Sequence, residues 1–450
     1  MEKPPFLRLA WLTLVWLALI ATLLVALNLK HPRLFFWRDW ETPVLFFVSC
    51  LILVFAIRAR HNSKRWLRRE AWLRLIAVAA VLVILLMQEG WFAWQKYQVV
   101  TGFAESSEEN QVARRVGRHF ITGFRSFKDV EPLAGQGLIG GIYLTRRNLV
   151  GETPASLSRR IADLQAQRRR VGLPPLVVMA DQEGGTVAHL SPMLETMPPL
   201  AALVTARSDA SLEQRGYDYG RRQGEAMASL GFTMNLAPVV DLKPQRQNTG
   251  IDLYTLIERR AIAADPRIVI RLATAYCQGQ LDAGIQPTVK HFPGLRQVSG
   301  DTHLFGESLP QSLSELTDDL LPFREVTAKT GAAMMLSHVR LTALDQKYPV
   351  SLSRAVVRKI LRSKNGGWNF QGLLITDDLN MEAVYRLGID EAATLALNAG
   401  VDLLLVSYDP DQYYRAIYGV VKKHWAGGVD EQSLVESTAR LNVFLTRRIE

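Results

Sequence analysis

The sequence predicts an α/β protein in which a (β/α)8 barrel of the TIM type follows an N-terminal transmembrane helical region. Short hydrophobic, β-branched runs alternate with longer amphipathic stretches from about residue 105 to residue 450. Polar residues recur where these short runs end, and apolar runs dominate the first hundred residues. Strands that alternate with helices over about three hundred residues are typical of a closed parallel barrel.

The composition favours a large core and a membrane segment over a nucleic-acid-binding protein. With 450 residues, 48% of them hydrophobic, the chain can bury a large core. The net charge of +10 is concentrated in and beside the apolar N-terminal third, without an aromatic-interleaved basic face or zinc-ligand spacing. Cys50 and Cys277 lie far apart, and Cys50 sits in a hydrophobic run, so neither a disulfide framework nor a metal site is expected.

Residues 1–100 predict a membrane anchor of about three helices, with the lipid bilayer as partner. Apolar runs cover Leu9–Leu29, Val44–Ile57 and Leu75–Trp94. The first and third are long enough for a hydrocarbon core of ~30 Å, which needs about 20 residues, whereas the second is short unless Trp40 and Thr42 enter the interface. The first run differs from a secretory signal, which has a shorter apolar core and a cleavage site, so we expect it to be retained.

The charge between the runs predicts the orientation. Only Glu70 opposes the basic residues between the second and third runs, which are Arg58, Arg60, Lys64, Arg65, Arg68, Arg69 and Arg74. By the positive-inside rule this loop stays in the cytoplasm. Three crossings then place the N-terminus inside and everything after Trp94 outside. Two crossings, with the short run lying in the interface, are the alternative, and the count decides the compartment of the barrel.

Residues 105–450 predict the barrel itself. The expected strands are Phe120–Gly123, Gly140–Leu144, Leu176–Ala180, Thr233–Pro238, Thr288–Phe292, Ala333–Ser337, Leu373–Thr376 and Asp402–Val406. The expected helices are Leu157–Arg169, Ser211–Leu230, Pro266–Ala283, Leu313–Thr330, Ser353–Ser363, Met381–Ala399, Pro410–His424 and Glu431–Arg447. An open doubly wound sheet is the alternative. Against it, no Gly-x-Gly-x-x-Gly follows the first strand, and polar residues recur at several strand ends.

Polar side chains gather where the expected strands end, which is where barrel enzymes carry their catalytic residues. In chain order they are Asp181, Asp241, Arg260, Lys290, His291, Asp301, His303, His338, Asp377 and Asp378. A single aspartate at such a place more often caps a helix or forms a turn. The convergence of several on one barrel mouth indicates an active site.

Five blocks at these strand ends carry a resemblance to a known family. They are Asp181-Gln182-Glu183-Gly184-Gly185, Ala237-Pro238-Val239-Val240-Asp241, Lys290-His291-Phe292-Pro293-Gly294, Asp301-Thr302-His303 and Thr376-Asp377-Asp378-Leu379-Asn380-Met381-Glu382. From about Arg118 onward the chain resembles glycoside hydrolase family 3, most closely its single-domain β-N-acetylglucosaminidases of bacterial cell-wall recycling. The resemblance therefore implies an O-glycosyl hydrolase with a carbohydrate substrate and no cofactor.

The resemblance implies a role for each catalytic residue. Asp377 matches the nucleophile that forms a covalent glycosyl-enzyme, as a retaining mechanism requires. His303 matches the group that acts first as acid and then as base, polarised by Asp301. Histidine titrates near neutrality, which suits it to both proton transfers.

The remaining candidates are assigned to the substrate. Asp181, Arg260, Lys290 and His291 match sugar-binding positions of the family, and His338 is grouped with them. A metal site is not expected among the histidines, because no pair has helical ligand spacing and Lys290 would repel a cation.

The match departs from the family pattern beside the site. Leu295-Arg296 stands where the family has His-Gly, and His189 and Thr186 stand where the cytosolic enzymes carry arginines. The loss of that glycine removes conformational freedom from the loop. These changes leave the nucleophile and the dyad intact but bear on the specificity for muropeptides and N-acetyl groups.

The leading hypothesis is a membrane-anchored retaining β-glycosidase of the β-N-acetylglucosaminidase type. It would hydrolyse terminal β-linked (N-acetyl)glucosaminyl residues of peptidoglycan-derived or related glycans. The orientation places it as a multi-pass protein of the bacterial inner membrane, with the catalytic domain on the periplasmic or extracellular side. A glycoside phosphorylase with the same residues and a catalytically degenerate, membrane-tethered glycan-binding module are the alternatives.

Overall fold

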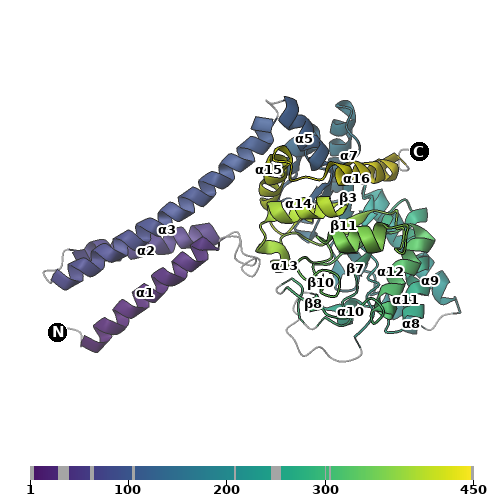
Figure 1. The fold of residues 1–450 in the computed structure, drawn as a ribbon, viewed down its shortest axis with the longest axis horizontal. Coiled ribbons are helices and arrows are strands. Elements are labelled where there is room, and N and C mark those ends of the chain that lie inside the picture. The colour runs from purple at the N-terminus through teal and green to yellow at the C-terminus, as the bar shows by residue number, and fades with distance from the viewer. Residues whose placement is uncertain are drawn as a thin grey trace. The chain divides into compact units, whose positions relative to one another are not determined.

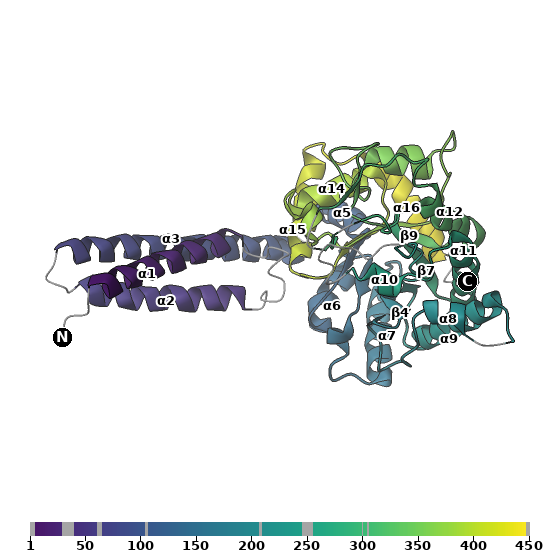
Figure 2. The ribbon, with the colours of Figure 1, turned by 90° about the horizontal axis from the view of Figure 1, so that it is seen from below.

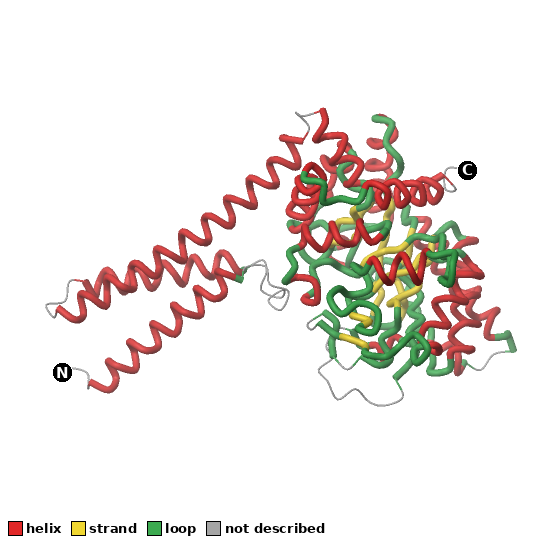
Figure 3. Tube along the Cα trace, in the orientation of Figure 1, coloured by secondary structure: helices red, strands yellow, loops and turns green. Residues whose placement is uncertain are grey.

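The chain folds as two units, Met1–Tyr97 and Gln98–Glu450, in a computed structural model. The structure describes residues 5–28, 40–60, 65–103, 107–206, 209–244, 255–298, 300–303 and 306–446. Leu29, Lys64 and Arg447, which belong to segments predicted above, lie outside these residues. The first unit is helical, and in the second the strands lie at the centre with helices around them (Figures 1 and 3).

The second unit is built on an eight-stranded parallel sheet that closes on itself. In spatial order its strands are β11 (Leu374–Thr376), β9 (Ala333–Leu336), β7 (Gln286–Phe292), β6 (Met234–Asn235), β3 (Val177–Ala180), β2 (Gly141–Tyr143), β1 (Phe120–Thr122) and β12 (Leu404–Val406). A parallel bridge between Ile375 and Leu403 joins the two ends of this order, and Thr376 N–H donates to Leu403 O at 2.9 Å. The predicted (β/α)8 barrel is therefore confirmed, with a strand at each expected place.

A helix follows each barrel strand before the next begins. In chain order these are α6 (Phe127–Gln136), α7 (Pro154–Arg170), α9 (Leu212–Ser229), α11 (Pro266–Asp282), α12 (Thr317–Thr330), the π-helix η4 (Ala355–Arg362), α14 (Ile389–Ala399) and α15 (Gln412–Trp425). Before β1 lie η2 (Gln98–Gly102) and α5 (Ser107–Gly117), and α16 (Glu431–Thr446) follows α15. Smaller elements in the loops are η3 (Arg146–Leu149), α8 (Ala201–Thr205), α10 (Ile257–Arg260), α13 (Glu382–Tyr385) and the strands β4 (Gln182–Gly184), β5 (Val187–Ala188), β8 (Ser308–Leu309) and β10 (Arg340–Leu341).

Two helical segments differ from the sequence-based expectation. Helix α6 was not predicted, because it is short and contains Pro132, although the Ser126 side chain caps it and Asp129 completes a capping box. The expected helix Met381–Ala399 is interrupted at Gly388, whose φ of 84° belongs to the left-handed region that favours glycine. This interruption separates α13 from α14.

The barrel interior is a packed apolar core. It contains alternating residues of the strands together with two side chains of α16, namely Ile121, Tyr143, Val177, Met179, Met234, Leu236, Ala333, Met335, Leu373, Ile375, Leu403, Leu405, Leu441 and Phe444. Such filling makes the cylinder a rigid support rather than a pore. Functional side chains can therefore lie only at its rim.

Asp402 joins the last strands to the surrounding helices where the barrel closes. Its fully buried carboxylate accepts hydrogen bonds from Leu374 N at 2.7 Å and from Arg362 at 2.5 Å on one oxygen. The other oxygen accepts from Ser437 and from Arg440, both at 2.8 Å. A buried charge is tolerated when it is paired and hydrogen-bonded in this way, so β11, η4 and α16 are held together at one point.

The first unit consists of α1 (Pro5–Leu27), α2 (Glu41–Arg60) and α3 (Arg65–Tyr97), which lie alongside one another (Figure 2). Small apolar clusters between the helices include Leu19, Ile52 and Val78. Large apolar side chains point outward over the described residues, with Phe47 63% and Leu86 72% exposed. Among these residues, Ala71–Gly102 is long and apolar enough to cross a membrane, whereas the apolar stretches Thr13–Leu27 and Glu41–Val54 are shorter.

Candidate active site

A buried ammonium group organises the rim of the barrel. Lys290 lies at the end of β7 and is 1% exposed. Its Nζ forms ion pairs with Asp181, which follows β3, and with Glu183 Oε1 at 2.6 Å. Tyr143, the last residue of β2, donates a hydrogen bond to the second oxygen of Asp181. Burial alone would raise the pKa of Asp181, but the charge of Lys290 outweighs it, so this pKa lies below its usual range and the carboxylate stays ionised.

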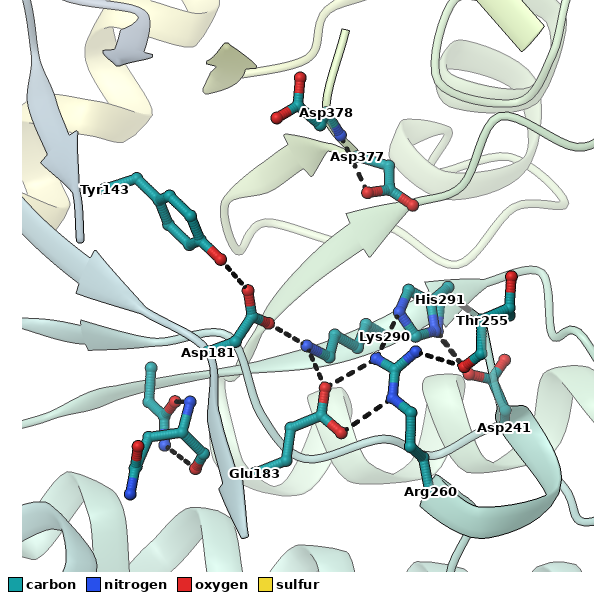
Figure 4. Close-up of polar contacts among 12 residues, drawn as sticks. Tyr143, Asp181, Glu183, Asp241, Thr255, Arg260, Lys290, His291, Asp377 and Asp378 are labelled. Carbon is teal, nitrogen blue, oxygen red and sulfur yellow. Dashed lines mark hydrogen bonds and ion pairs between the residues drawn. The ribbon is translucent and has the colours of Figure 1, made fainter. Parts of the chain in front are cut away.

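The same chain of contacts continues through Arg260 to His291, as Figure 4 shows. Arg260 binds Glu183 in a two-pronged arrangement at 2.7 and 3.0 Å. It also donates to His291 Nε2 at 3.2 Å, while Asp241 contacts His291 Nδ1 at 2.7 Å. Burial and the two cations Arg260 and Lys290 lower the pKa of His291 to about 3. The imidazole is therefore neutral, with its proton on Nδ1 toward Asp241.

His303 and Asp301 form a pair on the loop after β7. Asp301 is fully buried, and its Oδ1 contacts His303 Nδ1 at 3.0 Å and accepts from His303 N at 2.9 Å. Thr255 donates to the same oxygen at 3.1 Å. The side chain of His303 is 21% exposed. Glu382 N–H donates to His303 O at 3.3 Å, which docks this loop on the segment that follows Asp377 and Asp378.

The two aspartates after β11 have different environments. Asp378 is 3% exposed, and its carboxylate accepts from Ser407 N, Ser407 Oγ and Tyr408 N on one oxygen and from Asn380 N and Nδ2 on the other. Asp377 is only partly buried, and its carboxylate accepts from Asp378 N at 2.9 Å. The two side chains point in different directions (Figure 4). Asp378 thus serves the structure of the loop, and Asp377 is the carboxylate presented at the rim.

His338 lies beneath this loop. It is 1% exposed, with Nδ1 against Ser351 Oγ at 2.6 Å and Nε2 against Asp378 O at 2.9 Å. Burial lowers the pKa of its imidazole. Both ring nitrogens are thus occupied by protein groups in this structure, and a contact between His338 and a substrate stays a prediction.

The residues that depart from the family pattern also border the site. Arg296 binds the buried carboxylate of Asp319 at 2.7 Å, and Leu295 N donates to Asp241 at 2.9 Å. His189 packs edge-on against Tyr143 with ring centroids 6.2 Å apart, and Thr186 is exposed on the β4–β5 hairpin. In the described part of the chain, no group of three or more His, Cys, Asp or Glu side chains could hold a metal ion.

Among the residues at this site, Glu183, Tyr143 and Tyr408 were not sequence-based candidates. Glu183 belongs to the Asp181-Gln182-Glu183 block, from which only Asp181 was a candidate. In the structure, Glu183 also forms an ion pair with Lys290. Tyr143 ends β2 and Tyr408 lies two residues beyond β12, but only charged residues and histidines at strand ends were sequence-based candidates. The occurrence of tyrosines near strand ends is the sequence signal that indicates both.

The comparisons with known proteins agree with this geometry. The family profile described as the glycosyl hydrolase family 3 N terminal domain matches residues 111–443. Beta-hexosaminidase LpqI of Mycobacterium tuberculosis is 32% identical over 296 residues, which cover 65% of this chain and 72% of the relative. A beta-hexosaminidase of Tolumonas auensis is 33% identical over 270 residues, covering 59% and 75%. The solved glycoside hydrolase family 3 beta-N-acetylglucosaminidase of a Paenibacillus species has a TM-score of 0.67 at 31% identity, covering 75% of this chain and 62% of that one.

The different environments of the two aspartates predict different effects on stability. Replacing Asp378 by Ala removes a buried carboxylate and leaves the donors of Ser407, Tyr408 and Asn380 without this acceptor, so we expect a loss of roughly 3 kcal/mol in the free energy of unfolding. Asp377→Ala removes a partly exposed group with few partners and should change it by less than about 0.5 kcal/mol. Denaturant unfolding of the two variants measures the difference, and equal losses would contradict these roles.

Proposed function

Because the chain belongs to glycoside hydrolase family 3, and is therefore a glycoside hydrolase, we propose that it is a retaining β-N-acetylglucosaminidase. Its substrate is a terminal β-linked N-acetylglucosaminyl residue of a peptidoglycan-derived or related glycan. The observation that carries the proposal is the presentation of Asp377 above a completed cluster of Asp181, Lys290, Glu183 and Arg260. The names of the relatives, beta-hexosaminidase and beta-N-acetylglucosaminidase, support the choice of sugar.

The cluster binds the sugar that is transferred. Carboxylate oxygens of Asp181 accept from sugar hydroxyls, and Lys290 and Arg260 donate to others. The charges already balance one another, since each cation faces a carboxylate within 2.7 Å. A neutral ligand therefore enters a site that is already ordered, with little reorganisation when it binds.

The reaction proceeds in two displacements. Asp377 attacks the anomeric carbon, the bond from this carbon to the leaving oxygen breaks, and His303 transfers a proton to that oxygen. Water then attacks the same carbon, His303 takes up the proton, and the Asp377 carboxylate leaves. Since Nδ1 of His303 faces Asp301 at 3.0 Å, Nε2 is the nitrogen that exchanges the proton. His338 and Asp378 position the Asp377 loop without reacting.

The first unit is proposed to anchor the enzyme in a bilayer. Its outward side chains are large and apolar, while polar contacts such as Thr42 Oγ1 to Glu89 at 2.9 Å lie between helices. This arrangement suits a lipid environment. The basic residues at the start of α3, Arg65, Arg68, Arg69 and Arg74, favour the cytoplasmic side, so three crossings place the barrel outside.

The function is tested with the full-length protein in detergent and an aryl β-N-acetylglucosaminide. We expect turnover without phosphate, and a loss of at least about 10³-fold in kcat for Asp377→Ala. Asp163→Ala, which removes an exposed carboxylate of α7, is the matched control and should retain full activity. A requirement for phosphate would indicate a phosphorylase, and no turnover of any glycoside would indicate a glycan-binding module.

Replacing His303 by Ala tests the acid role. A disaccharide has a poor leaving group that needs protonation, so its turnover should fall by about 10²–10⁴-fold, whereas an activated aryl glycoside should lose less in the first displacement. The release of the aryl group in a single turnover measures that step. Equal losses for both substrates would contradict the assignment.

A reporter fused to the C-terminus tests the orientation. An alkaline phosphatase fusion should be active, because that enzyme requires an oxidising compartment outside the cytoplasm. Removing the positive charges of Arg65, Arg68 and Arg69 should lower this activity by weakening the topological signal. Activity at the same position of a reporter that functions only in the cytoplasm would overturn the proposed location.

A further inference from the structure

Tyr408 occupies a place at the barrel rim that the proposed reaction does not use. It lies two residues beyond β12, at the same end of the barrel as Asp377 beyond β11. In the described part of the second unit, the exposed aromatic side chains are Tyr408, with 48% of its surface exposed, and Trp425, at 50%. Trp425 ends α15 on the outer layer, so of these two only Tyr408 lies on the loop after a barrel strand.

The backbone of Tyr408 is fixed relative to the proposed nucleophile. Tyr408 N and Ser407 N each donate to Asp378 Oδ2 at 2.9 Å, and the Ser407 hydroxyl donates to the same oxygen. Asp378 is the next residue after Asp377. One buried carboxylate therefore holds the loop after β12 against the loop that presents the nucleophile, and the aromatic ring extends from a rigid base.

The ring of Tyr408 lies beside the proposed proton donor. Its centroid is 6.0 Å from that of His303, and the two ring planes meet at 60°. Tyr143, another tyrosine of the rim, is 5% exposed and donates its hydroxyl to Asp181. The hydroxyl of Tyr408 makes no such bond with any residue that the structure describes. Tyr143 thus belongs to the polar cluster, whereas Tyr408 offers an aromatic surface to solvent.

The position of the ring relates it to one side of the glycosidic bond. The sugar that is transferred is held by charged groups, which suit its hydroxyls. His303 must reach the glycosidic oxygen, so a group beside it borders the part of the substrate that leaves. A pyranose ring has apolar faces of C–H groups, and these pack favourably on an aromatic ring.

We propose that Tyr408 forms the aromatic wall of a leaving-group subsite, and that this subsite takes a second pyranose ring. The proposal rests on the proposed function, since it uses the assignment of His303 as proton donor. Tyr408 is then a specificity-determining residue, which favours glycans as substrates over glycosides with small leaving groups.

The test compares two substrates with the same transferred sugar, using the full-length protein in detergent. The β-1,4-linked disaccharide of N-acetylglucosamine fills the leaving-group subsite, and the β-fluoride of N-acetylglucosamine leaves it empty. Tyr408→Ala should lower kcat/KM for the disaccharide about tenfold, chiefly through KM, which corresponds to about 1.4 kcal/mol. It should change kcat/KM for the fluoride by less than about twofold.

Two further variants complete the design. Tyr408→Phe keeps the ring and should behave as the unchanged protein on both substrates. Trp425→Ala removes an exposed aromatic ring elsewhere and should affect neither substrate. Tyr408→Leu provides a second truncation if the alanine variant does not fold, and turnover of the fluoride reports folding in every case.

The outcomes separate the subsite from the function on which it rests. An undiminished disaccharide reaction in Tyr408→Ala overturns the subsite, and so do equal losses on both substrates, which would place the ring against the transferred sugar. If the unchanged protein hydrolyses neither substrate, the proposed function fails, and the subsite fails with it.

Discussion

The geometry of the site depends on a buried ammonium group, Lys290, at the end of β7. An isolated charge in such a place would cost several kcal/mol in lost hydration, so its partners are required by the fold. Asp181 and Glu183 supply two carboxylates, and Glu183 in turn needs Arg260. Asp181 and Glu183 come from the segment that directly follows β3, whereas Lys290 lies on β7 and Arg260 on α10. Folding therefore brings these segments together and orders the proposed sugar-binding groups in one step.

The neutral state of His291 follows from the same cluster. Two cations beside a buried imidazole oppose a third positive charge, and Asp241 fixes the proton on Nδ1. The Asp241 carboxylate also accepts from Leu295 N, at the start of the loop that leads to Asp301 and His303. Arg296 binds Asp319 one residue later. Leu295 and Arg296 thus fasten the base of the loop that carries Asp301 and His303 to Asp241 and to α12.

A second organising group is Asp378, which no proposed reaction step uses. Its five hydrogen bonds unite the loops after β11 and β12 and leave its neighbour Asp377 to face the rim. An adjacent pair of identical residues is thus divided into a structural and a presented carboxylate. The direction of each side chain makes the division, because consecutive residues at a strand end point to different sides.

The sequence alone determined the barrel, because alternating hydrophobic runs and amphipathic stretches record which faces are buried. It also determined that charged residues such as Asp181, Lys290 and Asp377 meet at one rim, since parallel strands place their C-terminal ends together. Only the tertiary structure determined which partners the side chains at this rim bind and in which direction each one points. Contacts between segments distant in the chain produce the ion pair of Glu183 with Lys290, the inward direction of the Asp378 side chain and the position of Tyr408 beside His303. Local patterns carry no record of such contacts, because the spacing of residues along one element does not specify which other element will lie against it.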